Sequence, residues 1–402
     1  MPTYPTYKLG EICDILNGFP FKSSRYVSKG LRVIRITNVK KGFVIDDEPQ
    51  FYPIETQEEL KKYILKKDDL LISLTGNVGR VGILKEELLP AALNQRVGCL
   101  RIKNDKIVSL QYLFHLLNMD SFEKDCINSS KGIAQKNMST EWLKDYGVEL
   151  PPLATQRAIV TRIESLFAEL DKGVEKLKTA QQQLKVYRQA VLNDCLTKGS
   201  EKWENVKLGE VAEKIQIGPF GTQLHKSDYI EGGIPLINPM HISDRKIFPD
   251  NSFSVSTAKY KELENYYLST NDVILGRRGE MGRCAVVSEN ENGMLCGTGS
   301  LFIRGGKNLY AKYLCYLLSS QRIIAYFENS SSGTTMSNLN RGIVENTEIP
   351  LPSLPTQQRI VQEIETRLSA CDVMEKNINE SLQQAEALRQ SILKKAFSGE
   401  LV

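Results

Sequence analysis

The sequence lacks an apolar run long enough to cross a membrane. Its longest apolar stretch, residues 107–119, is interrupted by Ser109, Gln111, His115 and Asn118, and it is too short and too polar to span a bilayer. The opening Met-Pro-Thr-Tyr-Pro has no apolar signal core and no arginine-rich transit pattern. We therefore expect a cytoplasmic protein with no membrane partner.

Histidine is scarce, with three residues in 402, and the eight cysteines form no C-x-x-C pair. Disulfide scaffolds are typical of much shorter chains, and the cysteine spacing fits no zinc ribbon. We expect the cysteines to be small buried apolar residues, and we expect no metal site.

Motifs of several enzyme classes are also absent. The chain has no Walker A motif, no G-x-S-x-G, no P-D…D/E-x-K and no N-P-P-[FY], for which Asn238-Pro-Met-His241 is the nearest segment. GRRGEMG at 276–282 lacks the spacing and the following Lys-Ser/Thr of a phosphate loop. These absences predict a protein that is not catalytic on its own and binds no cofactor.

The charge is only mildly basic. A formal net charge of +4 and a pI of about 8.4 permit nucleic-acid binding but fall below the pI typical of dedicated DNA-binding domains. A length of 402 residues predicts two domains, because single cores stop growing below that size.

The sequence does contain an internal duplication, and such a repeat indicates the domain organisation of a chain. PPLATQRAIVTRI at 151–163 returns as PSLPTQQRIVQEI at 352–364, and RQAVLNDCLTKG at 188–199 returns as RQSILKKAFSGE at 389–400. Upstream matches are fainter: KLGEI at 8–12 with KLGEV at 207–211, and DLLISLTGNVGR at 69–80 with DVILGRRGEMGR at 272–283. The order is module, long segment, module, long segment.

The long segments, residues 155–197 and 356–398, carry heptads that predict coiled-coil helices. Prolines precede both segments and a glycine follows each, as expected at helix ends. Four heptad positions are polar: Gln181, Arg188, Glu375 and Arg389. Either another helix or chain covers this part of the seam, or the long side chains reach solvent near the helix ends.

Within the modules, short strand patterns dominate, as in residues 31–36 and 69–74, with a short helix over 110–118. The fold class is therefore α+β: two similar mixed α/β modules, separated and followed by long helices. The expected domains are 1–150 and 199–350 for the modules, with 151–198 and 351–402 for the helices.

Three pairs of loops are the candidate binding elements. Glycine lets a backbone approach a ligand closely, arginine can grip phosphate or read guanine, and asparagine or glutamine can read adenine. The alternative is that the glycine loops are plain hairpin turns with solvated arginines. The candidates are Lys22, Ser23, Arg25, Thr75, Asn77, Arg80, Lys131, Gln135 and Lys136 in the first module, and Thr222, Gln223, His225, Lys226, Arg277, Arg278, Arg283, Thr334, Thr335 and Asn338 in the second.

Two diverged modules, each followed by PxLxTQ..IV…I and a long helix, resemble the specificity subunit of a type I restriction-modification enzyme. The tail KKAFSGEL at 394–401 is similar to that family's tail, and the resemblance covers essentially the whole chain. It implies two target recognition domains that each read one half of a split, asymmetric site in double-stranded DNA. It also implies that the two helices pair as an antiparallel coiled coil and fix the gap between the half-sites.

The resemblance further implies two methyltransferase subunits docked on the repeated helical regions, with Gln156, Ile159, Gln357, Ile360 and Phe397 as docking candidates. S-adenosylmethionine, ATP and magnesium are expected on partner subunits, and a motor-nuclease subunit is expected only where DNA is also cut. The first copy departs from the family tail, because residues 193–199 read NDCLTKG. The similarity to the family tail therefore holds for the C-terminal helix and not for the central one.

Two other functions are compatible with parts of the sequence. A DNA adenine methyltransferase with a non-standard site would bind S-adenosylmethionine as an isolated chain, and the missing N-P-P-[FY] argues against it. A coiled-coil scaffold that binds only protein would show no preference for any DNA sequence. The DNA specificity subunit accounts for the duplicated modules best.

Overall fold

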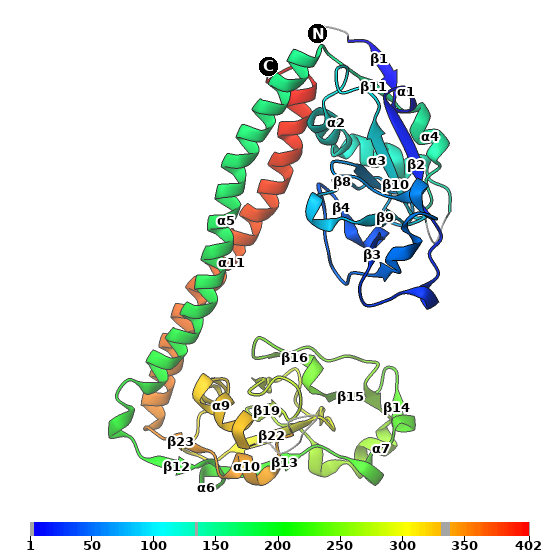
Figure 1. Cartoon of the computed structure of the whole chain (residues 1–402). Coiled ribbons are helices and arrows are strands. Elements are labelled where there is room, and N and C mark those ends of the chain that lie inside the picture. Colours follow the sequence, from blue (N-terminus) through cyan, green and yellow to red (C-terminus); the bar gives the residue numbers. More distant parts are fainter. Residues whose placement is uncertain (1–3, 133–135, 331–337, 402) are drawn as a thin grey trace. The chain divides into compact units, whose positions relative to one another are not determined.

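The computed structural model of the protein describes residues 4–132, 136–330 and 338–401. The chain forms two compact units, 1–177 with 380–402, and 178–379. It passes between them twice, each time inside a long helix: α5 (Leu153–Thr197) and α11 (Leu354–Phe397). Each unit therefore holds one mixed module and about half of each helix (Figure 1).

The first module is built on a four-stranded antiparallel sheet in the order β2-β10-β7-β8. A second sheet has the order β6-β3-β9, in which β3 and β9 are parallel. The strands are β1 (Thr6–Lys8), β2 (Cys13–Asn17), β3 (Leu31–Ile34), β4 (Val39–Lys40), β5 (Phe43–Val44), β6 (Phe51–Tyr52), β7 (Leu70–Ser73), β8 (Val81–Ile83), β9 (Ala91–Leu93), β10 (Val97–Ile102) and β11 (Gly147–Glu149). The helices are α1 (Leu9–Ile12), α2 (Leu110–Leu117), α3 (Asp120–Ser129) and α4 (Thr140–Asp145).

The second module repeats this topology, with a main sheet in the order β13-β22-β19-β20 and a parallel pair, β15 with β21. Its strands are β12 (Asn205–Lys207), β13 (Ala212–Ile217), β14 (Tyr229–Ile230), β15 (Ile234–Ile237), β16 (Ile242–Ser243), β17 (Lys246–Ile247), β18 (Ser254–Val255), β19 (Val273–Gly276), β20 (Cys284–Val286), β21 (Leu295–Cys296), β22 (Ser300–Gly305) and β23 (Glu348–Pro350). Its helices are α6 (Leu208–Val211), α7 (Thr257–Glu262), α8 (Ala311–Leu318), α9 (Gln321–Ser330) and α10 (Arg341–Glu345). The α+β class and the duplicated architecture are confirmed.

The heptads predict the buried faces of α5 and α11 correctly. All twenty heptad positions are buried or half-buried; they are Val160, Ile163, Phe167, Leu170, Val174, Leu177, Gln181, Leu184, Arg188 and Val191 in α5, and Val361, Ile364, Leu368, Cys371, Glu375, Ile378, Leu382, Ala385, Arg389 and Ile392 in α11. Within each unit the start of one helix lies in the same core as the end of the other, so the pairing is antiparallel.

The polar heptad positions are satisfied by the opposite helix, so no covering chain is needed to explain them. Arg188 bonds Asp372 at 2.5 Å and Glu375 at 2.9 Å, and Gln181 donates to Asn379. Arg389 pairs with Asp171 and lies over the ring of Phe167. The pairs Arg188–Asp372 and Arg389–Asp171 occupy matching positions of the repeat, as expected for an antiparallel pair with internal symmetry.

Each long helix joins two hydrophobic cores. The first-unit core includes Ile163 near the start of α5 and Leu393 near the end of α11, together with strand residues such as Ile72. The second-unit core likewise includes Ile364 and Val191, with Leu275. All eight cysteines are free and buried, as expected of small apolar residues. No helix in the described part of the chain is long and apolar enough to cross a bilayer.

Candidate nucleic-acid interface

The glycine loop of the first module, residues 74–80, connects β7 to β8 and is closed by its own hydrogen bonds. The Ser73 hydroxyl donates to the carbonyl of Asn77 and accepts from the amide of Arg80. Gly76 and Gly79 adopt φ of +70° and +83°, conformations that favour glycine. The result is a well-defined loop that exposes Asn77 and leaves Thr75 and Arg80 half-buried.

The structure brings the segment around Lys131 and Lys136 to this loop. The amide of Gly76 donates to the carbonyl of Lys136, and the amide of Met138 donates to the carbonyl of Leu74, both at 2.8 Å. The Thr75 hydroxyl also bonds the Asn137 side chain at 3.1 Å. Two of the three predicted loops thus form one surface, on which Lys131 and Lys136 are exposed. Gln135 lies outside the described residues.

The third predicted loop of this module is held separately. Lys22, Ser23 and Arg25 are exposed around one short turn, and the Arg25 guanidinium lies 5.0 Å from the centre of the Tyr52 ring. Among the residues that the structure describes, no hydrogen bond joins this turn to the glycine loop. The cation–π contact leaves the guanidinium edge free for another ligand.

The second module has the same loop arrangement with different side chains. The amide of Leu339 donates to the carbonyl of Arg277, and the backbones of Arg278 and Asn338 form a bridge. Arg278 is exposed, whereas Arg277 is only 8% exposed and its Nε donates to the Leu339 carbonyl at 2.7 Å. Arg277 therefore supports the loop in this conformation. Burial, and then the charge of Arg278, lower the pKa of Arg277. Thr334 and Thr335 lie outside the described residues.

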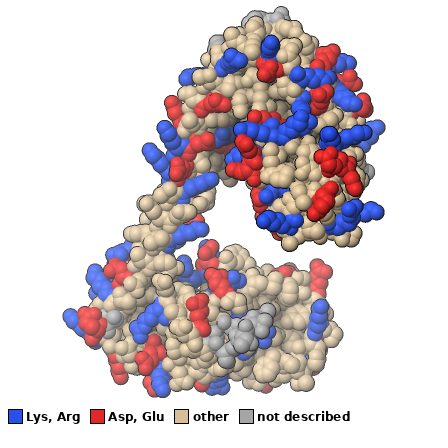
Figure 2. Space-filling model, viewed as in Figure 1, with Lys and Arg blue, Asp and Glu red and all other residues tan. Residues whose placement is uncertain are grey.

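The remaining candidates of this module divide into engaged and free side chains. Arg283 forms an ion pair with Glu280 at 2.6 Å and donates to the Pro239 carbonyl. Gln223 accepts a hydrogen bond from the Tyr266 hydroxyl. The side chains of Thr222, His225 and Lys226 are exposed. On the faces visible in Figure 2, lysines and arginines are interspersed with acidic residues, so neither unit shows an extended single-sign patch there.

Each module also contains an ion pair that was not identified from the sequence. It lies just before the strand that leads into the glycine loop, β7 in the first module and β19 in the second. Arg101 of β10 pairs with Asp69 at 2.6 Å, and Arg304 of β22 pairs with Asp272 at 2.8 Å. Both carboxylates are almost fully buried, with side chains 3% and 1% exposed. The two aspartates are the first residues of the matched segments 69–80 and 272–283, so the repeat could have identified them as paired residues. The arginines lie outside those segments.

The helix-start glutamines, predicted to dock a partner, are instead fully buried. Gln156 accepts from the amide of Ser109 and donates to the carbonyls of Ile107 and Pro151. Gln357 makes the same three bonds with Tyr310, Asn308 and Pro352. Since each amide is satisfied within its own module, neither glutamine can touch a partner in this conformation. Ile159 and Ile360 are each only 6% exposed.

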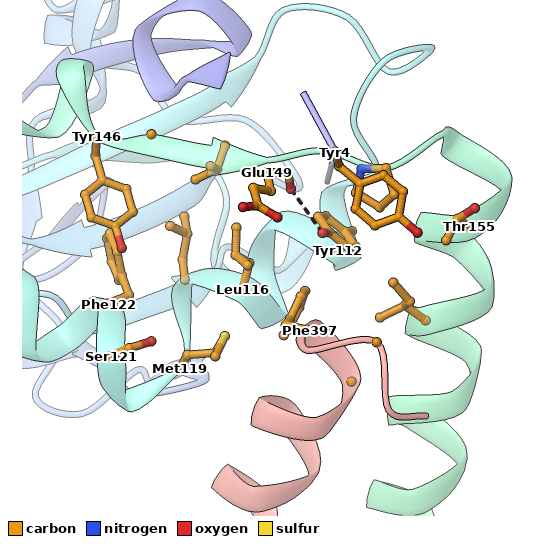
Figure 3. A pocket seen from close by; sticks show the side chains of 17 residues that line it. Tyr4, Tyr112, Leu116, Met119, Ser121, Phe122, Tyr146, Glu149, Thr155 and Phe397 are labelled. Atoms are coloured by element: carbon orange, nitrogen blue, oxygen red, sulfur yellow. Dashed lines mark hydrogen bonds between the residues drawn. The ribbon is translucent and has the colours of Figure 1, made fainter. Parts of the chain in front are cut away.

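Phe397, the last docking candidate, lines a cavity of about 340 Å³ in the first unit. Its ring meets that of Tyr112 edge-on, with centres 5.2 Å apart, and the Tyr112 hydroxyl donates to the Glu149 carbonyl. Figure 3 shows this cavity between α2, the start of α5 and the end of α11, with Tyr4 and Thr155 at its rim. Phe397 is half-buried, so part of its ring remains accessible.

Two modules of one topology, each presenting a glycine loop at the end of a four-stranded sheet, define a two-module binding protein. The family model for the type I restriction modification DNA specificity domain matches residues 1–179 and 200–384. The chain therefore belongs to the family of type I restriction-modification specificity subunits, which are the non-catalytic, DNA-specificity components of these systems. This confirms the resemblance seen in the sequence.

Individual relatives agree with this assignment. The chain is 27% identical to the EcoBI specificity subunit of Escherichia coli, over 98% of this chain and 85% of that protein. It is 24% identical to the StySPI specificity subunit of Salmonella potsdam, over 99% and 89%. The fold matches a chain reported under "complex assembly and conformational transition of the type I R-M system", with a TM-score of 0.73, 20% identity and coverage of 100% and 99%. The specificity subunit of Thermoanaerobacter tengcongensis matches with a TM-score of 0.54, 20% identity and coverage of 100% and 98%.

Proposed function

We propose that each module reads one half of a bipartite, asymmetric site in double-stranded DNA. The observation that carries this is the recurrence of one loop surface with different side chains. Thr75 and Asn137 meet in the first module, and Arg278 and Asn338 meet at the matching place in the second. Two modules that read different base sequences need the same backbone arrangement with different hydrogen-bond donors and acceptors on it.

We assign the phosphate and base contacts to the exposed or half-exposed candidates. In the first module these are Lys22, Ser23, Arg25, Thr75, Asn77, Arg80, Lys131 and Lys136. In the second module they are Thr222, Gln223, His225, Lys226, Arg278, Arg283 and Asn338. Gln135, Thr334 and Thr335 remain predicted contacts, and Arg277 acts by holding its loop. Partner subunits supply the phosphate contacts that a net charge of +4 leaves unmet.

The helix pair sets the gap between the half-sites and docks two methyltransferase subunits, one near each helix start. Since Gln156, Ile159, Gln357 and Ile360 are buried, their role is to shape the surface. The exposed Arg157 and Arg359 and the accessible part of Phe397 would touch the partner. Those partners bring S-adenosylmethionine and flip out the target adenine. A motor-nuclease subunit, using ATP and magnesium, joins where DNA is also cut, and the complex works in the cytoplasm.

The test is methylome sequencing of a methylation-free host that expresses this chain with its cognate methyltransferase subunit. The control host expresses the methyltransferase alone. A split motif with methyladenine in both halves, present only with this chain, is the expected result. A stable complex that methylates no new motif and selects no sequence from a duplex library would favour the scaffold function instead.

A further inference from the structure

The half-buried Lys41 lies in the turn of the β4–β5 hairpin and forms two ion pairs with α3. Its Nζ lies 2.5 Å from Asp120 Oδ1 and 2.8 Å from Glu123 Oε2. The Lys41 side chain is 29% exposed and that of Glu123 is 26% exposed, so the pair with Glu123 is less screened by solvent than most surface pairs. The side chain of Asp120 is 50% exposed. Burial lowers the pKa of Lys41, but the bonds to Asp120 and Glu123 outweigh it and leave that pKa raised.

The two elements that Lys41 joins hold the glycine loop from both sides of Arg80. On one side, α3 lies so close to Gly79 that a Cβ there would meet Cys126 Cβ at 2.8 Å. On the other, the hairpin lies against Gly82, where a Cβ would meet the Phe43 backbone at 2.7 Å. The amide of Gly42 also donates to the carbonyl of Val81 at 2.9 Å. Arg80 is thus fixed between two glycines whose neighbours are tied together by Lys41.

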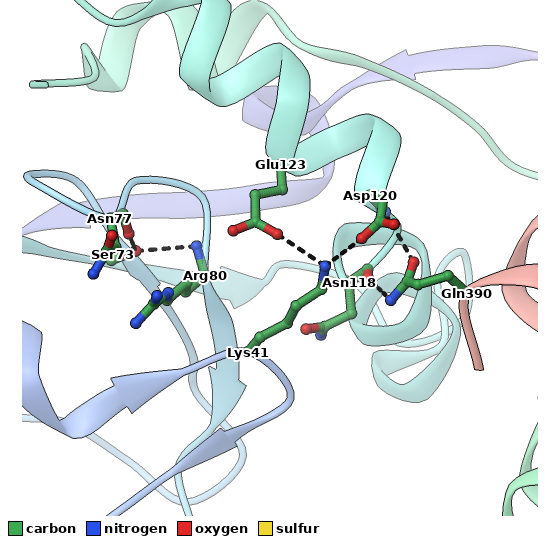
Figure 4. Close-up of polar contacts among 8 residues, drawn as sticks. All are labelled: Lys41, Ser73, Asn77, Arg80, Asn118, Asp120, Glu123 and Gln390. Carbon is green, nitrogen blue, oxygen red and sulfur yellow. Dashed lines mark hydrogen bonds and ion pairs between the residues drawn. The ribbon is translucent and has the colours of Figure 1, made fainter. Parts of the chain in front are cut away.

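A second bond set ties this assembly to the long helix α11. Gln390 Oε1 accepts from the amide of Asp120 at 3.0 Å, and its Nε2 donates to the carbonyl of Asn118 at 3.3 Å. The glutamine therefore bridges the junction between α2 and α3, and it does so at the first residue of α3, where Lys41 binds. Figure 4 shows Lys41 reaching from the hairpin to Asp120 and Glu123, with Gln390 on the far side of Asp120.

We propose that Lys41 and Gln390 are positioning residues for the DNA-reading loop of the first module, and that they set the place of Arg80 and Asn77 relative to the helix pair. This inference rests on the proposed function. Neither residue needs to touch DNA. Their bonds hold α3, the hairpin and α11 in one arrangement, and the glycine loop is positioned by its contacts with α3 at Gly79 and with the hairpin at Gly82.

Among the residues that the structure describes in the second module, no ion pair joins the β16–β17 turn to α9, so the Lys41 pairs belong to the first module. Asp244 and Arg245 occupy the β16–β17 turn in place of Lys41 and Gly42, and the fourth residue of α9 is Ile324 in place of Glu123. There, Ile324 packs against Gly282, and Arg245 lies 5.2 Å from the centre of the Tyr316 ring. Loss of the Lys41 pairs should therefore affect one half-site alone.

The experiment selects DNA from a duplex library randomised over both half-sites, using the complex of this chain with its methyltransferase subunit. Arg80→Ala first identifies the half read by the first module. Lys41→Met is then expected to weaken base preference in that half by about tenfold, the size of one lost base contact, and to leave the other half unchanged. Lys41→Arg should retain the preference, and Gln390→Ala should weaken it in the same half.

Two controls separate positioning from general stability. Lys67→Met removes a more exposed ion pair, to Glu86, near the opposite end of the β7–β8 hairpin, and it should change neither half. In an Arg80→Ala background, Lys41→Met should add little, because the residue it positions is gone. Unchanged selection by Lys41→Met, or equal loss in both halves, would overturn the inference. If the unsubstituted complex selects no sequence, the proposed function fails instead.

Discussion

At the scale of single residues, buried polar side chains fix how each long helix is attached to its module, and the exposed side chains contribute less. Gln156 and Gln357 each connect the start of a long helix to the segment before α2 or α8 through two hydrogen bonds, and a third bond goes to the carbonyl of Pro151 or Pro352 just before the helix. Because the phrase that contains them recurs in both copies, they join helix and module in the same way twice. The recurrence of Gln156 as Gln357 is therefore explained by its role in folding, without reference to a partner protein.

Gln156→Ala should destabilise the first unit by about 3 kcal/mol, because it leaves the partly buried Ser109 amide and Ile107 carbonyl and the buried Pro151 carbonyl without their hydrogen-bond partner. Chemical unfolding, followed by a probe in the first unit such as Trp142, would measure it. Gln384→Ala, at an exposed position of α11 in the same unit, should shift the transition by less than about 0.5 kcal/mol. Equal effects of the two substitutions would contradict the assigned role of Gln156.

His115 should make the first unit sensitive to acid. Burial, and then the charge of Arg389, lower its pKa from 6.5 to about 4; Glu164, 3.9 Å away, is too exposed to compensate. The unfolded chain therefore binds more protons between these values, and stability falls as the pH drops through this window. From pH 7 to pH 5 the loss is about 2 kcal/mol.

The comparison of thermal unfolding at these two pH values tests this account. His115→Phe keeps an aromatic ring and should remove most of the acid-dependent loss. The exposed His225 is the matched control, and His225→Gln should leave the loss intact. If His115→Phe retains the full pH dependence, another group is responsible.

At the scale of elements, the polar heptad residues set how α5 meets α11. Arg188 pairs with Asp372, and reversal of both charges in Arg188→Glu with Asp372→Arg should recover stability lost in either single variant. We expect a coupling energy of about 1 kcal/mol that decreases with added salt, since Asp372 is 68% exposed. A double-mutant cycle by chemical unfolding measures it. The control cycle combines Arg188→Glu with Asp171→Arg, at the matching position in the other unit, and should be additive.

The sequence predicted the periodic and repeated elements well and the long-range contacts poorly. Heptads identified the buried faces of α5 and α11, and the strands at 31–34 and 70–73 followed from short apolar runs. The inward position of Gln156 could not be predicted, because its partners are 47 and 49 residues away for the longer bonds. Gln390 and Asp120, 270 residues apart, have no sequence pattern that links them.

At the scale of the whole molecule, the proposed spacing function depends on both helices together. Removal of one heptad from α5 and one from the facing part of α11 shortens the pair by about 10 Å at 1.5 Å per residue. That length corresponds to about three base pairs of DNA. We expect methylome sequencing to show a shorter gap with both half-site sequences unchanged. An unchanged gap in an active complex would refute the spacing function.

The most direct test of the central claim exchanges one module. Residues 1–150 are replaced by the first module of another family member whose split site differs, and the methylome is read in a methylation-free host with the cognate methyltransferase. The account predicts that one half of the methylated motif changes to that of the donor while the other half and the gap stay as they were. A change in both halves, or in neither, from a complex that still methylates DNA would contradict independent reading by the two modules.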